Sequence, residues 1–192
     1  MNLAGVDEAG RGCLAGPVVA AAVIWPEGLT LAGLTDSKAL SHRKRMALRE
    51  ELIALLSDGQ WAIGQASAEE IDQINILQAT YLAMHRAIEQ LQPQPDLLLI
   101  DGNRFNAFPG IEHRCEIRGD VRFQAISAAS IFAKTTRDAI MTQGHLMHPQ
   151  YGWDSNKGYP SPKHKEALMA HGPCDWHRTS FRWRPSQFRL DI

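Results

Sequence analysis

The amino-acid sequence predicts an α/β fold in which a mixed β-sheet is flanked by helices and followed by a small C-terminal extension of helix and loop. Short apolar runs alternate along the chain with longer segments whose apolar residues recur at helical spacing. The run "LLLI" at 97–100 is continuously apolar, which is typical of a central strand covered on both faces. Because 192 residues suit one main domain, we expect that domain at 1–145, with residues 146–192 packed on it.

The first half of the chain contains three predicted strands and two predicted helices. The strands are expected at 3–7, 16–26 and 61–67. Glycines and a tight connection between the first two strands predict an antiparallel pair, which the third strand extends into a meander. Ser41 is placed to cap a helix that continues to about Leu56. Ser67 and Glu70 form a capping box for the second helix, which continues to about Leu91 with Ile74 in its apolar stripe.

The second half of the chain adds two strands that must join the sheet across helices. One strand ends at Asp101, and a weaker one covers 112–120 and ends at Asp120. A helix rich in small residues is expected at 123–141. A long loop at 148–164 and a short helix over "PKHKEALMAHG" complete the regular part of the chain.

Composition excludes several classes of protein. The three cysteines are far apart and form no C-x-x-C pair, which argues against a disulfide framework or a zinc site. We expect neither a signal peptide nor a membrane span, because no basic N-terminal region precedes an apolar run and no apolar stretch approaches ~20 residues. The expectation is therefore a soluble cytoplasmic protein, and we expect it to be a monomer. From Lys157 onward the chain carries seven Lys/Arg and three Asp/Glu, which favours a polyanionic partner.

Acidic side chains stand at the ends of three predicted strands. Asp7 ends the first strand and Glu8 follows it, and Asp101 and Asp120 end the later two. Strands in one sheet lie ~4.8 Å apart, so carboxylates at the ends of neighbouring strands can converge. Such a cluster is repulsive unless a cation neutralises it. Oxygen ligands suit Mg²⁺ or Mn²⁺, and two such ions about 4 Å apart can hold the attacking water and the leaving oxygen in phosphodiester hydrolysis.

Other roles for the acidic residues and the histidines are open at this point. A single Asp at the end of a strand is most often a turn former or a helix cap, and Asp120 after Gly119 can simply begin a turn. Asp138 is a competing acid, but it lies inside a predicted helix, where an ion pair or a surface position is expected. The histidines show no metal-binding spacing and are interpreted as packing or surface residues.

The sequence resembles ribonuclease HII, a type 2 ribonuclease H. The matching stretches extend from residue 5 to about 181 and are "GVDEAGRG", "LAGPVVAAAV", "LTDSKAL", "LLLIDGN", "AISAASIFAKTTRD", "NKGYPSPKH" and "HRTSF". The resemblance implies a ribonuclease H-like fold and hydrolysis of the RNA strand of RNA–DNA hybrids. It also implies incision on the 5′ side of single ribonucleotides in duplex DNA, which leaves a 5′-phosphate, with Mn²⁺ or Mg²⁺ as the cofactor.

The resemblance also implies roles for particular residues. The four metal-binding carboxylates of the family match Asp7, Glu8, Asp101 and Asp120. The loop that reads the ribose 2′-hydroxyl matches Gly10, Arg11 and Gly12. A tyrosine that stacks on a sugar near the RNA–DNA junction matches Tyr159, so the segment 146–192 would contact substrate. A lysine beside the backbone phosphates matches Lys38.

The chemistry of these residue types agrees with the implied roles. Only RNA carries the 2′-hydroxyl, which both donates and accepts hydrogen bonds. Glycines at 10 and 12 allow the backbone to approach that hydroxyl closely. Arg11 adds a forked cation suited to phosphate, and Tyr159 on its constrained loop can present a ring to a sugar or base. The alternatives are a partly buried anchoring role for Tyr159 and a solvated position for Lys38.

Two other functions compete with a ribose-reading nuclease. One is a nuclease or integrase of the ribonuclease H-like superfamily that acts on DNA alone. The other is a catalytically silent nucleic-acid-binding module, against which the four acids argue because they repel phosphate without metal.

The C-terminal end of the chain is less well defined by the resemblance. "GPCDW" before "HRTSF" departs from the family pattern, so contacts of Arg178 and Arg182 are undefined. The final "SQFRLDI" is either a plain tail or a peptide that docks on a replication clamp.

Overall fold

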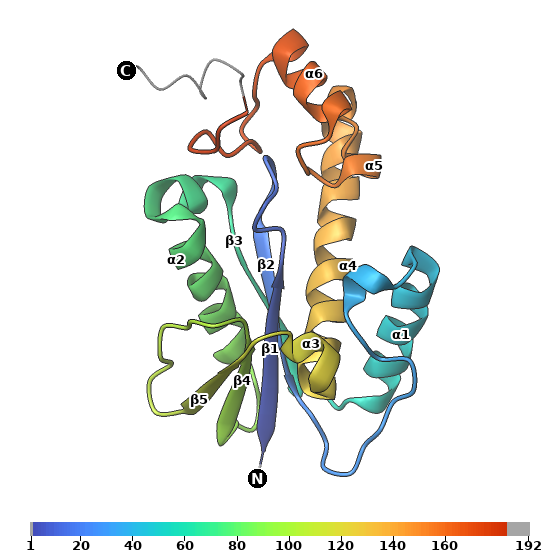
Figure 1. Cartoon of the computed structure of the whole chain (residues 1–192), viewed down its shortest axis with the longest axis vertical. Helices are drawn as coiled ribbons and strands as arrows, with labels where there is room; N and C mark the ends of the chain where they lie inside the picture. Colours follow the sequence, from blue (N-terminus) through green and yellow to red (C-terminus); the bar gives the residue numbers. More distant parts are fainter. Residues whose placement is uncertain (1, 184–192) are drawn as a thin grey trace.

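The computed structural model describes residues 2–183 and places a five-stranded sheet between helices (Figure 1). The strands are β1 (Leu3–Ala9), β2 (Val18–Ile24), β3 (Trp61–Ala66), β4 (Leu97–Asp101) and β5 (Glu112–Glu116). Their order across the sheet is β3-β2-β1-β4-β5. The first three strands form the predicted antiparallel meander, and β4 and β5 add in parallel to β1. The link from β1 to β2 spans residues 10–17, so the expectation of a tight connection is wrong.

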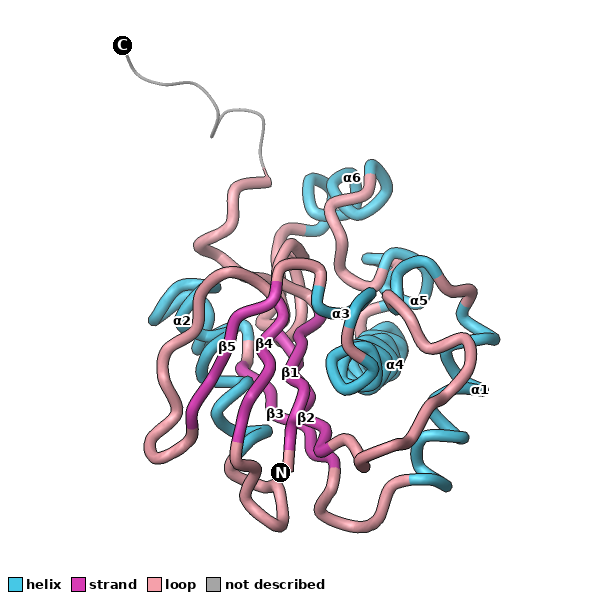
Figure 2. The backbone as a smooth tube through the Cα atoms, turned by 60° about the horizontal axis from the view of Figure 1, so that its bottom comes forward, coloured by secondary structure: helices cyan, strands magenta, loops and turns pink. Residues whose placement is uncertain are grey.

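Helices cover both faces of the sheet. The longer ones are α1 (His42–Leu55), α2 (Ala68–Ile88), α4 (Gln124–Met147) and α6 (Pro162–His171). Short turns of helix are η1 (Ser37–Ala39), α3 (Gly119–Arg122), η2 (Pro149–Tyr151) and α5 (Trp153–Asn156). Figure 2 shows α2 along one face of the sheet and α4 along the other, with α1 on the outer side of α4. No helix within residues 2–183 has the length and apolar content needed to cross a membrane.

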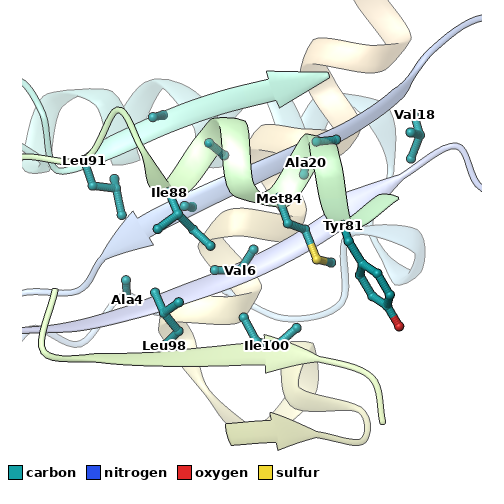
Figure 3. Packing of buried hydrophobic residues seen from close by; sticks show 14 of the residues in the cluster. Ala4, Val6, Val18, Ala20, Tyr81, Met84, Ile88, Leu91, Leu98 and Ile100 are labelled. Carbon is teal, nitrogen blue, oxygen red and sulfur yellow. The ribbon is translucent and has the colours of Figure 1, made fainter. Parts of the chain in front are cut away.

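The main hydrophobic core lies between α2 and the sheet. Tyr81, Met84 and Ile88 of α2 point toward β1, β2 and β4, as Figure 3 shows. On the opposite face, α4 lies directly on β1 because Gly5 has no side chain. A Cβ atom at Gly5 would stand 2.2 Å from the carbonyl carbon of Ala125. This close packing fixes the strand that delivers Asp7 and Glu8.

Helix α2 begins with the predicted capping box but is not a continuous helix. Ser67 accepts the N–H of Glu70, and the Glu70 carboxylate accepts the N–H of Ser67. At Asn75 the backbone turns to φ 66° and ψ 163°, and the Asn75 side chain caps a new helical start by accepting the N–H of Leu77 at 3.0 Å. An asparagine side chain competes with the helical hydrogen bonds in this way. Ile74, which was expected in the apolar stripe, is consequently 38% exposed.

Three further expectations about element boundaries are wrong. The strand expected at 112–120 ends at Glu116, and Arg118 enters the left-handed region at φ 54°. Asp120 therefore lies in α3 rather than at a strand end. The helix expected at 123–141 continues to Met147, and the loop expected at 148–164 contains η2 and α5. The chain turns early because Asp101 Oδ1 accepts the N–H of Gly119 at 2.9 Å.

Candidate active site

Two neighbouring parallel strands bring the first acidic residues together. Val6 of β1 is paired with Ile100 of β4, so the next residues, Asp7 and Asp101, lie at the same end of the sheet. Glu8 follows Asp7 on β1, and the short helix α3 adds Asp120 beside them. Asp101 itself anchors α3 through its hydrogen bond with the N–H of Gly119. The four carboxylates thus come from three elements of the fold.

The protonation equilibria of these carboxylates reflect burial and mutual repulsion. Burial raises the pKa of Asp7 well above its usual range, and the charges of Glu8 and Asp101 raise it further. Burial likewise raises the pKa of Glu8, although Arg11 acts in the opposite direction. Burial and then the charge of Asp101 raise the pKa of Asp120. Negative charge is therefore concentrated here, and a bound cation would relieve that repulsion.

The donor set fits a hard divalent cation in chemistry but is not arranged around one in this conformation. All four candidate ligands offer carboxylate oxygens, which Mg²⁺ and Mn²⁺ prefer. Within residues 2–183, however, no three His, Cys, Asp or Glu side chains converge on a single point that can hold an ion. Asp7 Oδ1 accepts the N–H of Glu8 at 2.7 Å, and Glu8 Oε1 lies 3.4 Å from Arg11 Nη1. Both acids are therefore hydrogen-bonded within the protein in this conformation.

The Gly-Arg-Gly segment leaves β1 directly after the two acids. Arg11 is 51% exposed, so its contact with Glu8 contributes little stability. Gly10 adopts φ 96°, and a Cβ atom there would lie 1.9 Å from Nε of the buried Arg137. A Cβ atom at Gly12 would meet nothing within 4 Å. The loop is therefore packed closely on one side at Gly10 and open at Gly12.

One cavity of about 490 Å³ brings together most of the expected substrate contacts. It is lined by Glu8, the Gly10–Gly12 loop, Lys38, Lys134 and Tyr159, together with Ser37 and Ile76. Tyr159 is 38% exposed, and the ammonium of Lys134 lies 5.7 Å from its ring centroid. One cavity is therefore lined by an acidic side chain, a glycine-rich loop, two lysines and an aromatic ring.

Lys38 connects this cavity to the carboxylates. It lies in η1, where the side chain of Asp36 accepts the Lys38 N–H at 2.8 Å. Burial by itself would lower the pKa of Lys38, but the charges of Asp7 and Asp36 outweigh it and the pKa is raised. The sequence predicted Lys38 as a phosphate contact, and the structure places its charge among the acids.

The profile of the family described as Ribonuclease HII matches residues 4–184. The chain belongs to the ribonuclease HII family. It is accordingly a type 2 ribonuclease H enzyme, and the ribonuclease H-like fold expected from the sequence is confirmed.

Curated ribonuclease HII proteins are similar to this chain over nearly its whole length. Ribonuclease HII of Parabacteroides distasonis is 53% identical over 191 residues, which cover 97% of this chain and 93% of the relative. Ribonuclease HII of Porphyromonas gingivalis is 55% identical and covers 93% of this chain and 88% of the relative. The agreement therefore spans both the carboxylate-bearing strands and the C-terminal segment.

Solved structures of archaeal relatives have the same fold. Ribonuclease H2 of Pyrococcus horikoshii superposes with a TM-score of 0.78 at 27% identity and covers 94% of both chains. An RNase HII of Archaeoglobus fulgidus, solved in a complex with PCNA, gives a TM-score of 0.79 at 25% identity and covers 96% of both chains. A ribonuclease HIII solved with Mn²⁺ is 16% identical with a TM-score of 0.68, which shows a shared fold alone.

Several residues at this candidate site were not predicted from the sequence. Asp36 belongs to the stretch "LTDSKAL", in which only Lys38 was assigned a role. Ser130 and Lys134 are four residues apart on α4, a spacing that puts both on one helix face. Ser130 hydrogen-bonds Ser37 at 2.8 Å and reaches Asp7. That helical spacing is the signal that could have identified them.

The competing acid and the histidines have roles consistent with packing and pairing. Asp138 forms an ion pair with Lys134 at 2.6 Å, as expected for a helical residue. His164 and His177 are buried and contact one another. Arg178, whose contacts were undefined, is buried against the Gly-Arg-Gly loop, whereas Arg182 is exposed.

Proposed function

We propose that this ribonuclease HII cleaves the RNA strand of RNA–DNA hybrids and incises 5′ of single ribonucleotides in duplex DNA. The products would be a 3′-hydroxyl and a 5′-phosphate. The observation that carries this proposal is the shared cavity, in which Glu8 stands beside the Gly10–Gly12 loop. Because Glu8 and the Gly10–Gly12 loop line the same cavity, a group that takes part in cleavage and a group that reads the ribose can act on the same nucleotide.

The carboxylates Asp7, Glu8, Asp101 and Asp120 are proposed to hold Mg²⁺ or Mn²⁺, two ions when substrate is bound. Such ions supply charge neutralisation for the scissile phosphate and orientation for the attacking water and the leaving oxygen. Oxygen-only donors and the raised pKa values of Asp7, Glu8 and Asp120 support this assignment. The related ribonuclease HIII solved with Mn²⁺ supports the choice of a divalent ion.

The Gly10–Gly12 loop is proposed to read the 2′-hydroxyl through its backbone. The open space at Gly12 supports close approach of a sugar, and the exposed side chain of Arg11 can swing from Glu8 to a phosphate. Tyr159 is proposed to stack on a sugar at the RNA–DNA junction, and Lys38 to contact backbone phosphates. The half-exposed ring of Tyr159 in the same cavity supports its role.

The division of labour along the chain follows from these assignments. Residues 1–145 would form the catalytic part, and 146–192 would contact substrate through Tyr159. We propose that the protein acts as a monomer. The clamp contact expected for 186–192 falls outside the described residues and stays a prediction, for which the Archaeoglobus fulgidus complex with PCNA provides a precedent.

The test is incision of a duplex that contains one embedded ribonucleotide, run with Mg²⁺, with Mn²⁺ and with a chelator. An RNA–DNA hybrid and an all-DNA duplex of the same sequence serve as comparison substrates. We expect metal-dependent cleavage of the first two and none of the all-DNA duplex. Cleavage of the all-DNA duplex would instead indicate a DNA nuclease. Binding without metal-dependent turnover would indicate a silent binding module.

A further inference from the structure

Arg178 connects the C-terminal segment to the ribose-reading loop. Its side chain is only 1% exposed, although it arrives from the far end of the chain. Nη2 donates to the carbonyl oxygen of Gly10 at 2.7 Å, and Nη1 donates to that of Arg11 at 2.9 Å. Nε and Nη2 also donate to the carbonyl oxygen of Gly16, at 3.0 and 2.9 Å. One guanidinium therefore holds three carbonyl groups of the loop.

These hydrogen bonds determine the direction of the next two N–H groups. The peptide unit is planar and trans, so its C=O and N–H point in opposite directions. Because the carbonyls of Gly10 and Arg11 face Arg178, the N–H groups of Arg11 and Gly12 face away from it. Neither N–H donates to an acceptor within residues 2–183. Both donors are therefore available to a ligand on the open side of the loop.

The residues after Arg178 are held by a single carboxylate on α2. Asp72 Oδ2 accepts the N–H and the hydroxyl of Thr179, both at 2.8 Å. Asp72 Oδ1 accepts the N–H of Ser180 at 2.9 Å and also its hydroxyl. Burial by itself would raise the pKa of Asp72, but the hydrogen bonds from Ser180 and Thr179 outweigh it and lower the pKa. The carboxylate is thus matched to four donors.

The end of the loop nearest β2, residues 15–17, is held by a different side chain, that of Arg137. Arg137 Nη2 donates to the carbonyl of Ala15 at 2.9 Å, Nε to that of Pro17 at 3.0 Å, and Nη1 to that of Lys157 at 2.8 Å. Loosening Arg178 therefore leaves the path of residues 15–17 fixed. Within the described residues, Arg178 alone holds the carbonyl of Arg11, whereas the carbonyl of Gly10 also accepts the N–H of Cys13 at 3.4 Å.

We propose that Asp72 and Arg178 are positioning residues for ribose selection. Asp72 fixes Thr179 and Ser180, which places Arg178, and Arg178 aims the N–H groups of Arg11 and Gly12 toward the ribose. Neither side chain touches the reacting atoms. This inference rests on the proposed function and adds to it a specific prediction, that ribose selection depends on a carboxylate on α2.

The test uses variants at the surface end of this connection. Asp72→Asn keeps the size of the side chain but leaves one acceptor oxygen, and the double variant Thr179→Val/Ser180→Ala removes both hydroxyl donors. Thr179→Ser retains the hydroxyl and should keep the wild-type kcat/KM. Glu69→Gln is the matched control, because it makes the same charge change in the same helical turn. Among the described residues, the Glu69 carboxylate accepts a hydrogen bond from Gln73 alone. Arg178→Lys keeps the positive charge but loses the planar guanidinium that donates to three carbonyl groups.

The measurements are kcat/KM on the single-ribonucleotide duplex and Kd for the all-DNA duplex. We expect Asp72→Asn and the double variant to lower kcat/KM about 10-fold, because each removes two of the four hydrogen bonds to Asp72. Arg178→Lys should lower kcat/KM about 100-fold, because it removes hydrogen bonds to the loop itself. In these variants the Kd for the all-DNA duplex should stay within about two-fold of the wild-type value. For Thr179→Ser and Glu69→Gln, both kcat/KM and this Kd should stay within about two-fold of wild type.

Two results would overturn the inference. One is unchanged kcat/KM in Asp72→Asn, and the other is an equal loss of all-DNA binding, which would show general loosening of the fold. If Arg178→Lys fails to fold, Asp72→Asn still decides. Wild-type enzyme that shows no preference for the ribonucleotide would instead refute the proposed function, and the positioning role with it.

Discussion

The Nε2 atom of His164 lies 3.1 Å from the Nε2 atom of His177 in a buried aromatic cluster. Trp153 Nε1–H donates to the same nitrogen of His164 at 3.1 Å, so that nitrogen is an acceptor. The proton of His164 is therefore on Nδ1, which donates to the carbonyl oxygen of Tyr159 at 2.9 Å. His177 donates through Nε2 and accepts the N–H of Cys174 at Nδ1. This network assigns the neutral form to both rings.

Stability should fall as the solution is acidified through the titration range of this pair. Burial, followed by the charge of His164, lowers the pKa of His177 to about 4, and burial lowers that of His164. An unfolded histidine titrates near 6.5, so between pH 6.5 and 4 the unfolded chain binds more protons. The contribution of neutral His177 to the free energy of unfolding is fully present above pH 6.5. It is lost as the pH falls toward 4, and the loss amounts to about 3 kcal/mol.

Denaturant unfolding at a series of pH values checks this, with His177→Phe as the comparison. The variant should be less stable than wild type at pH 7, and the difference should shrink as the pH falls to 4. The carboxylate cluster titrates in both proteins, so only the difference between them reports on His177. A difference that stays constant across the range would contradict the neutral pair.

Asp101→Asn should retain the fold and lose hydrolysis of an RNA–DNA hybrid. The amide oxygen of Asn can still accept the N–H of Gly119, so α3 keeps its anchor. It supplies no negative charge for a divalent ion, and it removes a charge that raises the pKa of Asp7. Asp96→Asn, at the other end of β4, is the charge-matched control. Thermal melting and hybrid cleavage are the measurements, and full activity in Asp101→Asn would reject the site assignment.

Tyr159→Ala should reduce incision at a lone ribonucleotide more than cleavage of a long hybrid. A hybrid offers many registers, whereas a single ribonucleotide depends on stacking at one junction. Loss of base or sugar stacking costs about 1–3 kcal/mol, so we expect a roughly 10- to 100-fold lower rate. Tyr159→Phe keeps the ring and should retain most activity. Equal losses on the two substrates would contradict the junction role.

Gly12→Ala and Gly10→Ala should separate ribose recognition from folding. A methyl group at Gly12 meets no protein atom within 4 Å, so the melting temperature should be unchanged. The same methyl group narrows the open side of the loop, and ribonucleotide incision should fall about 10-fold. Gly10→Ala should instead destabilise the fold by roughly 1–3 kcal/mol, because φ is 96° and Arg137 Nε lies 1.9 Å from the added carbon. Normal incision by Gly12→Ala would argue against close sugar contact there.

Much of the fold and of the site could be predicted from local patterns. The apolar run before Asp101 and the step from Val6 to Asp7 identify two central strands, although β1 continues past its two acids to Ala9. The Ser67–Glu70 capping box is a contact within one helical turn, so its residues alone suffice to predict it. These features depend on neighbours in sequence, and the structure confirms them.

Other features were decided by tertiary structure. Asp120 leaves the expected strand because the Asp101 carboxylate draws Gly119 into a turn. Asn75 interrupts an otherwise periodic helix through its own side-chain hydrogen bonds. Arg178 reaches Gly10 across 168 residues, and no local pattern encodes that contact. The sequence by itself determined which residues are proposed to bind metal, ribose and phosphate. Only the packed chain decided which backbone groups of the Gly10–Gly12 loop point away from Arg178, because their directions depend on hydrogen bonds between segments that are distant in sequence.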